Sequence, residues 1–205
     1  MKPILLVGSG GHCISCIDVI EFEEKYRIGG IVERSGKDRN PVLGYEVIGD
    51  DKDLPELIKK YPNVLVTVGQ IKRADLRVKL FSLLKKIGAQ LPIIISPHAY
   101  VSGHATLQEG TIVMHGAIIN ADSSIGENCI INTQALIEHD TVVESHCHIS
   151  TGAKVNGGAF VGTESFVGSG SVIHESVHIG KKCIISAGSV VRKNIPAGTT
   201  FICNT

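Results

Sequence analysis

The chain has 205 residues, with 20 lysines and arginines against 20 aspartates and glutamates, and a sequence pI near 7.1. This length allows one or two domains with their own cores. The zero formal charge argues against a surface for nucleic acid or anionic membrane, which needs a basic excess. The N-terminal MKPILLVGSGG has too short an apolar run for a signal peptide, and no run long enough for a membrane helix follows. The six cysteines include Cys13-x-x-Cys16 but no second pair for zinc, so we expect reduced thiols and a soluble cytoplasmic protein.

The first 96 residues alternate short apolar runs with helical patterns. The expected strands are residues 4–7, 28–32, 64–68 and 93–95. The expected helices are residues 14–24, a short helix from Asp50 or Asp51 to about residue 60, and residues 73–87, with Leu76, Leu80, Leu83 and Leu84 on one face and Gly88 as its stop. This alternation predicts a small parallel sheet built from βαβ units.

A stricter pattern begins at residue 97. An aliphatic residue occupies every sixth position from Val101 to Val191, sixteen in all and without an insertion. The residue four places after each is small or modest in size, from Ala105 to Ser189, and Ile195 breaks this rule. A six-residue period with two inward positions is the signature of a hexapeptide β-helix. We therefore expect triangular coils in which three hexapeptides make one turn.

This register predicts the surroundings of two cysteines. Cys129 and Cys147 are eighteen residues apart, which is one full coil, so their side chains should stack in the interior as small free thiols. The open sheet ends of such a coil need covering. We expect the N-terminal domain to cover one end and residues 195–198 to finish the other.

The array of six-residue repeats resembles the left-handed β-helix acyltransferases. Together with Gly8-Ser-Gly-Gly-His-Cys13 and Ile137-Glu-His-Asp140, it looks like the hexapeptide-repeat sugar acyltransferases of the PglD/NeuD group, and the resemblance covers essentially the whole chain. It implies a Rossmann-like nucleotide-sugar-binding domain over residues 1–96 and a left-handed β-helix acyltransferase domain over residues 97–205. The left hand comes from this resemblance alone, because the usual crossover preference is right-handed.

The corner Glu138-His139-Asp140 follows the inward Ile137, so the imidazole should project outward from a rigid turn. Acetyl transfer from a thioester needs a base for the proton of the nucleophile, and histidine suits that task at neutral pH. An adjacent carboxylate can hold one ring nitrogen and raise the basicity of the other. The resemblance implies His139 as the base and Asp140 as its partner. The alternative is a polar corner that only keeps the solenoid soluble.

The turn Gly8–Cys13 lies between a predicted strand and a predicted helix. Its glycines would let backbone N–H groups approach a phosphate at the helix N-terminus, although a plain tight turn is the alternative. A domain of this size fits a mononucleotide-type ligand better than a dinucleotide. The resemblance implies that a nucleotide sugar lies against the following residues: Gly10, Gly11 and His12 at the diphosphate, Glu33 near the base or ribose, and Val68-Gly69-Gln70 in the same crevice.

The resemblance also implies the co-substrate and the assembly. Acetyl-CoA would lie in a groove between subunits of a homotrimer, without a metal, and no nucleic acid or membrane insertion is expected. The implied contacts are Asn132 near the amine or acetyl group, His148 near the thioester, and Gly157, Ser169 and Ala187 along the pantetheine arm.

The leading interpretation is an acetyl-CoA-dependent N-acetyltransferase that acts on the amino group of a nucleotide-linked amino sugar for surface glycan biosynthesis. O-acetylation of a sialic-acid-type sugar is the alternative on the same chemistry. A metal-dependent hexapeptide enzyme of the carbonic anhydrase type would instead use His146 and His148. A non-enzymatic solenoid would show threonine ladders on one face, and the outer positions have none.

Overall fold

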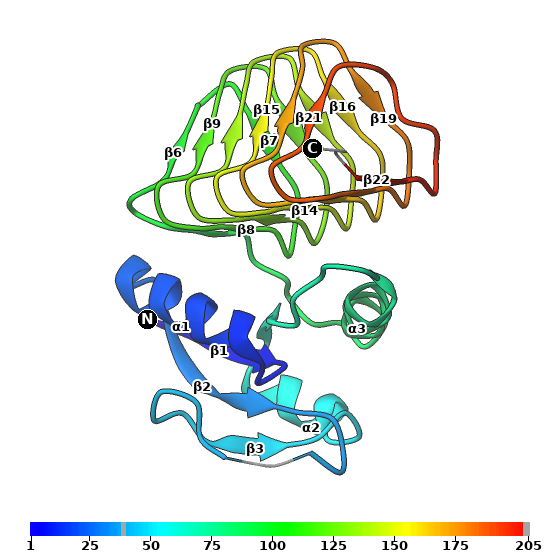
Figure 1. The fold of residues 1–205 in the computed structure, drawn as a ribbon. Coiled ribbons are helices and arrows are strands. Elements are labelled where there is room, and N and C mark those ends of the chain that lie inside the picture. The colour runs from blue at the N-terminus through cyan, green and yellow to red at the C-terminus, as the bar shows by residue number, and fades with distance from the viewer. Residues whose placement is uncertain (38–39, 203–205) are drawn as a thin grey trace.

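The computed structural model describes residues 1–37 and 40–202, and it places a small α/β domain against a long parallel β-helix (Figure 1). The elements of the first domain are β1 (Lys2–Val7), α1 (Gly11–Glu23), β2 (Tyr26–Val32), β3 (Val47–Gly49), α2 (Leu54–Lys60), β4 (Asn63–Val66) and α3 (Asp75–Lys86). Its strands pair in parallel in the order β3-β2-β1-β4. The predicted parallel sheet is therefore confirmed, and β3 is a strand that the sequence did not indicate.

Side chains of β1 alternate between the two faces of this sheet, as the strand period requires. Ile4 and Leu6 pack with α1, whereas Leu5 and Val7 pack with α2 and α3. The predicted apolar face of α3 needs correction. Its buried residues are Arg77, Leu80, Phe81 and Leu84, and Leu76 is 49% exposed.

The β-helix consists of two-residue strands separated by four-residue turns as far as β21, and a longer segment leads to the last strand. The strands are β5 (Ile94–Ile95), β6 (Tyr100–Val101), β7 (Thr106–Leu107), β8 (Ile112–Val113), β9 (Ile118–Ile119), β10 (Ser124–Ile125), β11 (Ile130–Ile131), β12 (Leu136–Ile137), β13 (Val142–Val143), β14 (His148–Ile149), β15 (Lys154–Val155), β16 (Phe160–Val161), β17 (Phe166–Val167), β18 (Val172–Ile173), β19 (His178–Ile179), β20 (Ile184–Ile185), β21 (Val190–Val191) and β22 (Thr200–Phe201). They form three parallel sheets. We call β22-β20-β17-β14-β11-β8-β5 the junction sheet, β21-β18-β15-β12-β9-β6 the ladder sheet, and β19-β16-β13-β10-β7 the third sheet.

The interior of the β-helix matches the predicted six-residue register. The aliphatic and small positions from Val113 onward form one buried cluster, and the first coil adds partly buried side chains such as Val101 and Leu107. Cys129 and Cys147 are both fully buried in it. Free thiols are found at Cys13, Cys16, Cys129, Cys147 and Cys183, and Cys203 lies outside the described residues.

The corners of the β-helix turn sharply because one residue in most of them adopts a left-handed conformation. Asp140 has φ 57° and His146 has φ 63°, while Gly152 fills the equivalent position with φ 65°. Aspartate, asparagine and glycine tolerate this conformation better than other residues do. The turn therefore fixes where Asp140 places its carboxylate.

The α/β domain covers the outer face of the junction sheet and not an open end of the coil, so the predicted end cover is wrong. Outward-facing Ile112 and Ile130 are fully buried in one cluster with Ile17 of α1. Strand β5 also needs correction, because it pairs with β8 of the β-helix and not with the first sheet. The β-helix thus begins just before the predicted division between residues 96 and 97.

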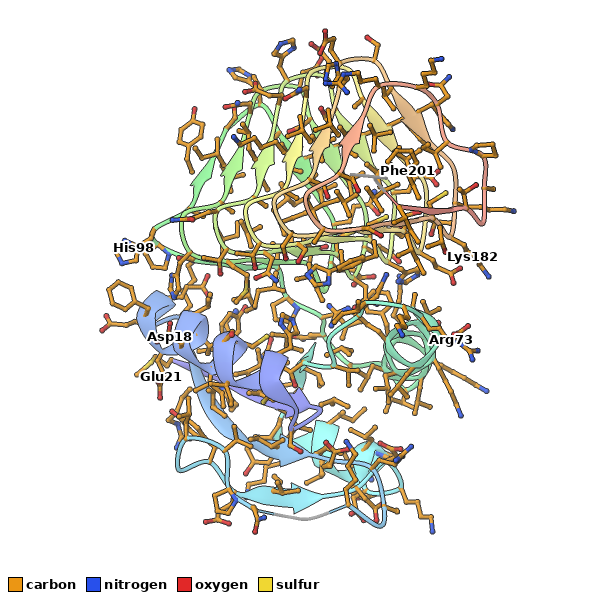
Figure 2. All side chains as sticks on the ribbon, viewed as in Figure 1. Asp18, Glu21, Arg73, His98, Lys182 and Phe201 are labelled. Atoms are coloured by element: carbon orange, nitrogen blue, oxygen red, sulfur yellow. The ribbon has the colours of Figure 1, made fainter. Side chains whose placement is uncertain are left out.

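Polar contacts also join the two domains at this junction. His115 Nε2 lies 2.8 Å from Asp18 Oδ2 on α1, and its Nδ1 lies 2.6 Å from Ser96 Oγ. In Figure 2, Asp18 marks the α1 side of this junction and His98 marks the β-helix side. Residues 195–198 close the last coils, since Ile195 bridges Ile179 and the chain continues into β22. Among the described helices, none combines the length and apolar character needed to cross a bilayer.

Candidate active site

A cleft of about 620 Å³ lies between the two domains. The α/β domain contributes its glycine-rich turn, the end of β2 and the loop after β4, and the β-helix contributes one corner and part of the junction sheet. The lining residues include Gly8, Gly10, Gly11, His12, Ser15, Glu33, Arg34, Lys37, Val68, Gly69, Gln70, Ile71, Leu76, Asn132, Thr133, His148 and Thr151. The structure therefore brings together all the residues predicted for the nucleotide sugar, and His148 as well.

The glycine-rich turn leaves open space above the N-terminus of α1. Gly8 is required by the fold, because its φ is +113° and a Cβ there would stand 2.6 Å from Val68 Cγ2. In contrast, a Cβ on Gly10 or Gly11 would meet no atom within 4 Å. The first turn of α1 has no acidic residue, so its N–H groups and helix dipole face the cleft uncompensated. This arrangement suits a phosphate-bearing ligand.

Glu33 braces this turn from the end of β2. Its Oε2 accepts hydrogen bonds from the N–H and the hydroxyl of Ser9 at 2.9 and 2.6 Å, and its Oε1 accepts one from the Arg34 N–H at 2.8 Å. Burial opposes ionisation, but these bonds and the charge of Lys37 outweigh it and lower the pKa of Glu33 to about 2. The carboxylate is thus committed to holding the turn, and its contact with a base or ribose stays a prediction.

His12 and His148 face the cleft as neutral imidazoles. Burial and the positive charge of Arg77 lower the pKa of His12 to about 3. Burial, opposed by a bond to the Gln70 carbonyl, lowers that of His148 to about 4. The thiol of Cys16 lies 3.4 Å from His12 Nε2, and Gly69 packs so closely that a Cβ there would be 3.3 Å from His12 Cβ. A glycine at position 69 therefore makes room for this imidazole.

His148 is held at both ring nitrogens. Its Nδ1–H donates to the Gln70 carbonyl at 2.5 Å, and its Nε2 accepts from Asn132 Nδ2 at 3.1 Å. The Asn132 side chain is fixed at its other end too, because its Oδ1 accepts from the Thr133 N–H at 2.8 Å. These bonds define one tautomer of His148 and one orientation of the Asn132 amide. The second amide hydrogen of Asn132 remains available to a ligand.

The His139–Asp140 pair lies at a different corner, between the ladder sheet and the third sheet. His139 Nδ1 donates to Asp140 Oδ2 at 2.6 Å, and the two side chains are 65% and 59% exposed. The predicted outward projection is confirmed. The bond to Asp140 raises the pKa of His139, with a further contribution from the charge of Glu138. Neither His139 nor Asp140 lines the cleft of its own chain.

The residues predicted along the pantetheine arm lie at two corner columns. Ser169 and Ala187 are one coil apart at the corner that also carries Asn132, and the Gly188 N–H donates to the Ser169 carbonyl at 2.8 Å. Gly157 lies one coil along from His139, with the Gly158 N–H bonded to the His139 carbonyl at 3.0 Å. Within the described chain, the N–H groups of Gly157, Ser169 and Ala187 have no acceptor. All three can donate to a ligand.

Sequence reasoning missed several residues of the cleft. Arg77 is a buried polar side chain that connects the domains, and Arg34, Lys37, Thr133 and Thr151 line the walls. Gln70 lines the cleft together with Val68 and Gly69, as the sequence predicted. The signal for Arg77 was its position three, four and seven residues before Leu80, Phe81 and Leu84 on the buried face of α3.

The alternative metal pair, His146 and His148, gains no support. His148 uses both ring nitrogens in hydrogen bonds, and His146 Nδ1 accepts from Asn128 Nδ2 at 3.0 Å.

Comparisons with known proteins match both halves of the chain. Residues 3–81 match the PglD N-terminal domain, and residues 158–193 match the bacterial transferase hexapeptide (six repeats). A perosamine N-acetyltransferase variant from Caulobacter crescentus, in complex with CoA and GDP-perosamine, is 33% identical, with a TM-score of 0.90 over 96% of this chain and 91% of that chain. The acetyltransferase domain of PglB from Neisseria gonorrhoeae, in complex with acetyl coenzyme A, is 29% identical, with a TM-score of 0.89 over 97% and 95%. No curated protein sequence matches.

The coil of six-residue repeats, with an open helix N-terminus beside it, defines a left-handed β-helix transferase of the hexapeptide class. Within that class, the chain belongs to the family of PglD-type sugar acyltransferases. The resemblance read from the glycine turn and the Glu138–Asp140 corner is confirmed at the level of the family and the enzyme class.

Proposed function

We propose that this chain transfers the acetyl group of acetyl-CoA to the amino group of a nucleotide-linked amino sugar, for surface glycan biosynthesis. The observation that carries the proposal is the interdomain cleft, which joins an open helix N-terminus to the fixed amide of Asn132 and to His148. The perosamine N-acetyltransferase of similar structure binds CoA and GDP-perosamine, and the acetyltransferase domain of PglB binds acetyl coenzyme A. These similarities support both halves of the proposed reaction.

The nucleotide sugar would enter with its diphosphate against the N–H groups of Gly10, Gly11 and His12. The steric openness of Gly10 and Gly11 supports this orientation, because the fold itself does not require glycine at either position. Arg34 and Lys37 add positive charge on the same side of the cleft. The sugar would then extend toward Asn132.

His139 would accept the proton of the attacking amine, with Asp140 holding Nδ1 and leaving Nε2 free. The amine adds to the thioester carbonyl, the proton passes to His139, and the CoA thiolate leaves. Since His139 does not line its own cleft, we propose that it serves the cleft of a neighbouring copy. A closed threefold ring with the ladder sheet innermost would bring the His139 corner of one copy against the Asn132 corner of the next.

The outer face of the ladder sheet supports such a ring. Its outward residues are mostly apolar and lie one coil apart: Tyr100, Ile118, Leu136, Lys154, Val172 and Val190. Tyr100 is 58% and Ile118 40% exposed in the single chain. A contiguous apolar row of this kind marks an interface. We therefore propose a homotrimer whose grooves hold acetyl-CoA along Gly157, Ser169 and Ala187.

The free buried thiols fit a reducing compartment, and we propose the cytoplasm as the location. The alternative acceptor, a sialic-acid-type hydroxyl, uses the same base and the same groove. The similarity to the perosamine N-acetyltransferase favours the amine.

The proposal is tested by measuring free CoA thiol released from acetyl-CoA with a panel of UDP-, GDP-, dTDP- and CMP-linked amino sugars and their hydroxyl analogues. We expect release only with an amino sugar, and an acetamido product by mass spectrometry. His139→Ala should lower turnover about 10²–10⁴-fold with folding intact. The matched control is His104→Ala, which removes another exposed corner histidine and should leave turnover unchanged. Release with none of the acceptors, or a near-normal rate for His139→Ala, would contradict the proposal.

A further inference from the structure

Arg77 is a buried arginine at the junction of the two domains. It is 1% exposed, and its Nη1 donates to the carbonyls of Val66 and Val68 at 2.6 and 2.9 Å. Its Nε donates to the carbonyl of Asn128 on the β-helix at 3.3 Å. One guanidinium thus ties the carboxyl end of β4 to a β-helix corner.

The segment that Arg77 holds also positions His148. Gln70 follows Val68 by two residues, and its Nε2 donates to the His146 carbonyl at 2.9 Å. Its own carbonyl accepts the Nδ1–H of His148 at 2.5 Å. The same loop therefore lines the nucleotide end of the cleft and sets the hydrogen bonding of the imidazole beside Asn132.

Arg77 carries its charge without an ionic partner in the described part of the chain. All its acceptors are neutral carbonyls, and its Nη2 is buried without a hydrogen-bond partner. Burial lowers the pKa of Arg77 to about 10, which still leaves the group charged at neutral pH. Apolar side chains often replace buried charges without loss of stability. A role beyond stability therefore has to explain this guanidinium.

We propose that Arg77 is a positioning residue of the cleft, which fixes the Val66–Gln70 segment against the β-helix and keeps His148 in the neutral, Nδ1-protonated form that Asn132 requires. A protonated His148 would present an N–H to the Asn132 amide instead of a lone pair, so the amide would have to turn over and lose its bond to the Thr133 N–H. The consequence for acetyl transfer rests on the function proposed above. The effect on His148 does not.

The groups that face His148 come from every element packed around it. They are the Gln70 carbonyl, Asn132 Nδ2, the Phe166 ring with centroids 5.2 Å apart, and the charge of Arg77. No carboxylate is among the groups that shift the pKa of His148. His12 lies close enough for His148 to lower its pKa, and Arg77 acts on it in the same direction. Burial is the larger cause that lowers the pKa of both imidazoles, and Arg77 adds the fixed positive charge that opposes their protonation.

The test is long-range ¹H–¹⁵N NMR of the ligand-free protein labelled on histidine, with the His148 signals assigned through His148→Asn. In the wild type we expect the Nδ1–H tautomer and no titration between pH 8 and pH 5. Arg77→Met should raise the pKa of His148 by about one unit or more and mix the tautomers. Arg77→Lys retains a positive charge, so the pKa of His148 in this variant should stay close to its wild-type value. Arg73→Met is the matched control, because Arg73 is an exposed cation just before α3. This variant should leave the pKa and the tautomer of His148 unchanged.

Wild-type His148 in the Nε2–H form, or an unchanged His148 titration in folded Arg77→Met, would overturn the proposal. If Arg77→Met fails to fold, Arg77→Gln, which keeps hydrogen-bond donors but removes the charge, takes its place and should raise the pKa of His148 in the same way. The ratio of acetyl transfer at pH 8 to that at pH 5 should also be about twofold higher in Arg77→Met than in the wild type, because about half of the His148 imidazoles would then be protonated at pH 5. If the wild type and Arg77→Met both show the expected spectra but the wild type transfers no acetyl group, the function fails and the role of Arg77 stands.

Discussion

Gly157 lies directly against the imidazole of His139 from one coil along the β-helix. A Cβ on Gly157 would stand 2.8 Å from Cε1 and 2.9 Å from Nε2 of that ring. The backbone of Gly157 does not adopt a positive φ, so its conformation is open to any residue. Glycine at position 157 therefore leaves space for the imidazole of His139 and is not required by the conformation of the turn.

Gly157→Ala is expected to reduce acetyl transfer by about tenfold or more, because the methyl group displaces the proposed base by a distance on the ångström scale. His139 is exposed and can swing toward solvent, so the melting temperature should change little. Steady-state kinetics and thermal melting together check this prediction.

Gly158→Ala provides the opposite signature. Gly158 has φ +67°, and a Cβ there would approach only Ser176 Oγ, at 3.5 Å. The strained backbone should cost about 1–2 kcal/mol of stability, while turnover stays near the wild-type rate. Equal turnover in Gly157→Ala and Gly158→Ala would show that the position of the His139 ring does not affect acetyl transfer.

Asp140→Asn is expected to move the acid limb of the pH–rate profile to lower pH. Asp140 raises the pKa of His139, so loss of its charge lowers that pKa and leaves the imidazole unprotonated at more acidic pH. The plateau rate should fall as well, because a weaker base accepts the proton less readily. Asparagine tolerates the φ of 57° at this position, so the fold should be unchanged.

Glu138→Gln serves as a graded control for Asp140→Asn. Glu138 acts on His139 only through its charge and is the weaker influence. A smaller shift of the acid limb in the same direction is expected, with most of the plateau rate retained. An acid limb that does not move in Asp140→Asn would contradict the assignment of His139 as the titrating base.

The β-helix was predictable from the sequence because every coil repeats the same physical requirement. Each six-residue step must supply one aliphatic and one small inward side chain, so the register could be followed from Val101 to Val191 and through Cys129 and Cys147. The outward direction of His139 followed from that register. The family motif, and not the period, distinguished His139 from the other corner histidines.

The junction between the domains could not be predicted in the same way. Ile112 and Ile130 are outward residues of the β-helix, and nothing in the six-residue period says that α1 covers them. Strand β5 was assigned to the wrong sheet, because two apolar residues carry no information about their partner. The cleft depends on this junction, so Arg77 and the hydrogen bond from Gln70 to the β-helix emerged only from the structure.

Gly11→Ala is expected to weaken nucleotide-sugar binding without harming the fold. A Cβ at this position meets no protein atom but projects toward the space assigned to the diphosphate. Alanine also restricts the unfolded chain, so stability should rise by about 0.4–1 kcal/mol. Calorimetric titration with nucleotide sugars checks the affinity, and Gly103→Ala, another unhindered glycine, is the control. A Gly11→Ala protein with normal affinity would place the diphosphate elsewhere.

Ala135→Leu is expected to destabilise the β-helix by about 1–3 kcal/mol, because the added atoms have no room in a packed interior. Ala135 is fully buried among the inward residues. Ala121→Leu adds the same atoms at an exposed corner, and its free energy of unfolding should stay within about 0.5 kcal/mol of the wild-type value. Urea unfolding of the two variants and the wild type measures the difference. Equal midpoints would mean that the coil interior is loosely packed at this level.

Glu33→Gln is expected to remove a contribution to stability that depends on pH. The pKa of Glu33 is lowered from 4.5 to about 2 in the folded chain, so its contribution is fully present above pH 4.5 and is lost as the pH falls toward 2. The free energy of unfolding of the wild type should therefore exceed that of Glu33→Gln by about 1–3 kcal/mol at pH 7. This difference should shrink between pH 4.5 and pH 2.

Urea unfolding at pH 7, 5, 4 and 3 follows the stability difference between Glu33→Gln and the wild type. Glu56→Gln, which changes an exposed carboxylate on α2, is the control and should show no such narrowing. Because Glu33 fixes Ser9 beside the open N-terminus of α1, Glu33→Gln should also weaken nucleotide-sugar binding at neutral pH. A stability difference that is the same at pH 7 and pH 3 would mean that the charge of Glu33 does not brace the glycine turn.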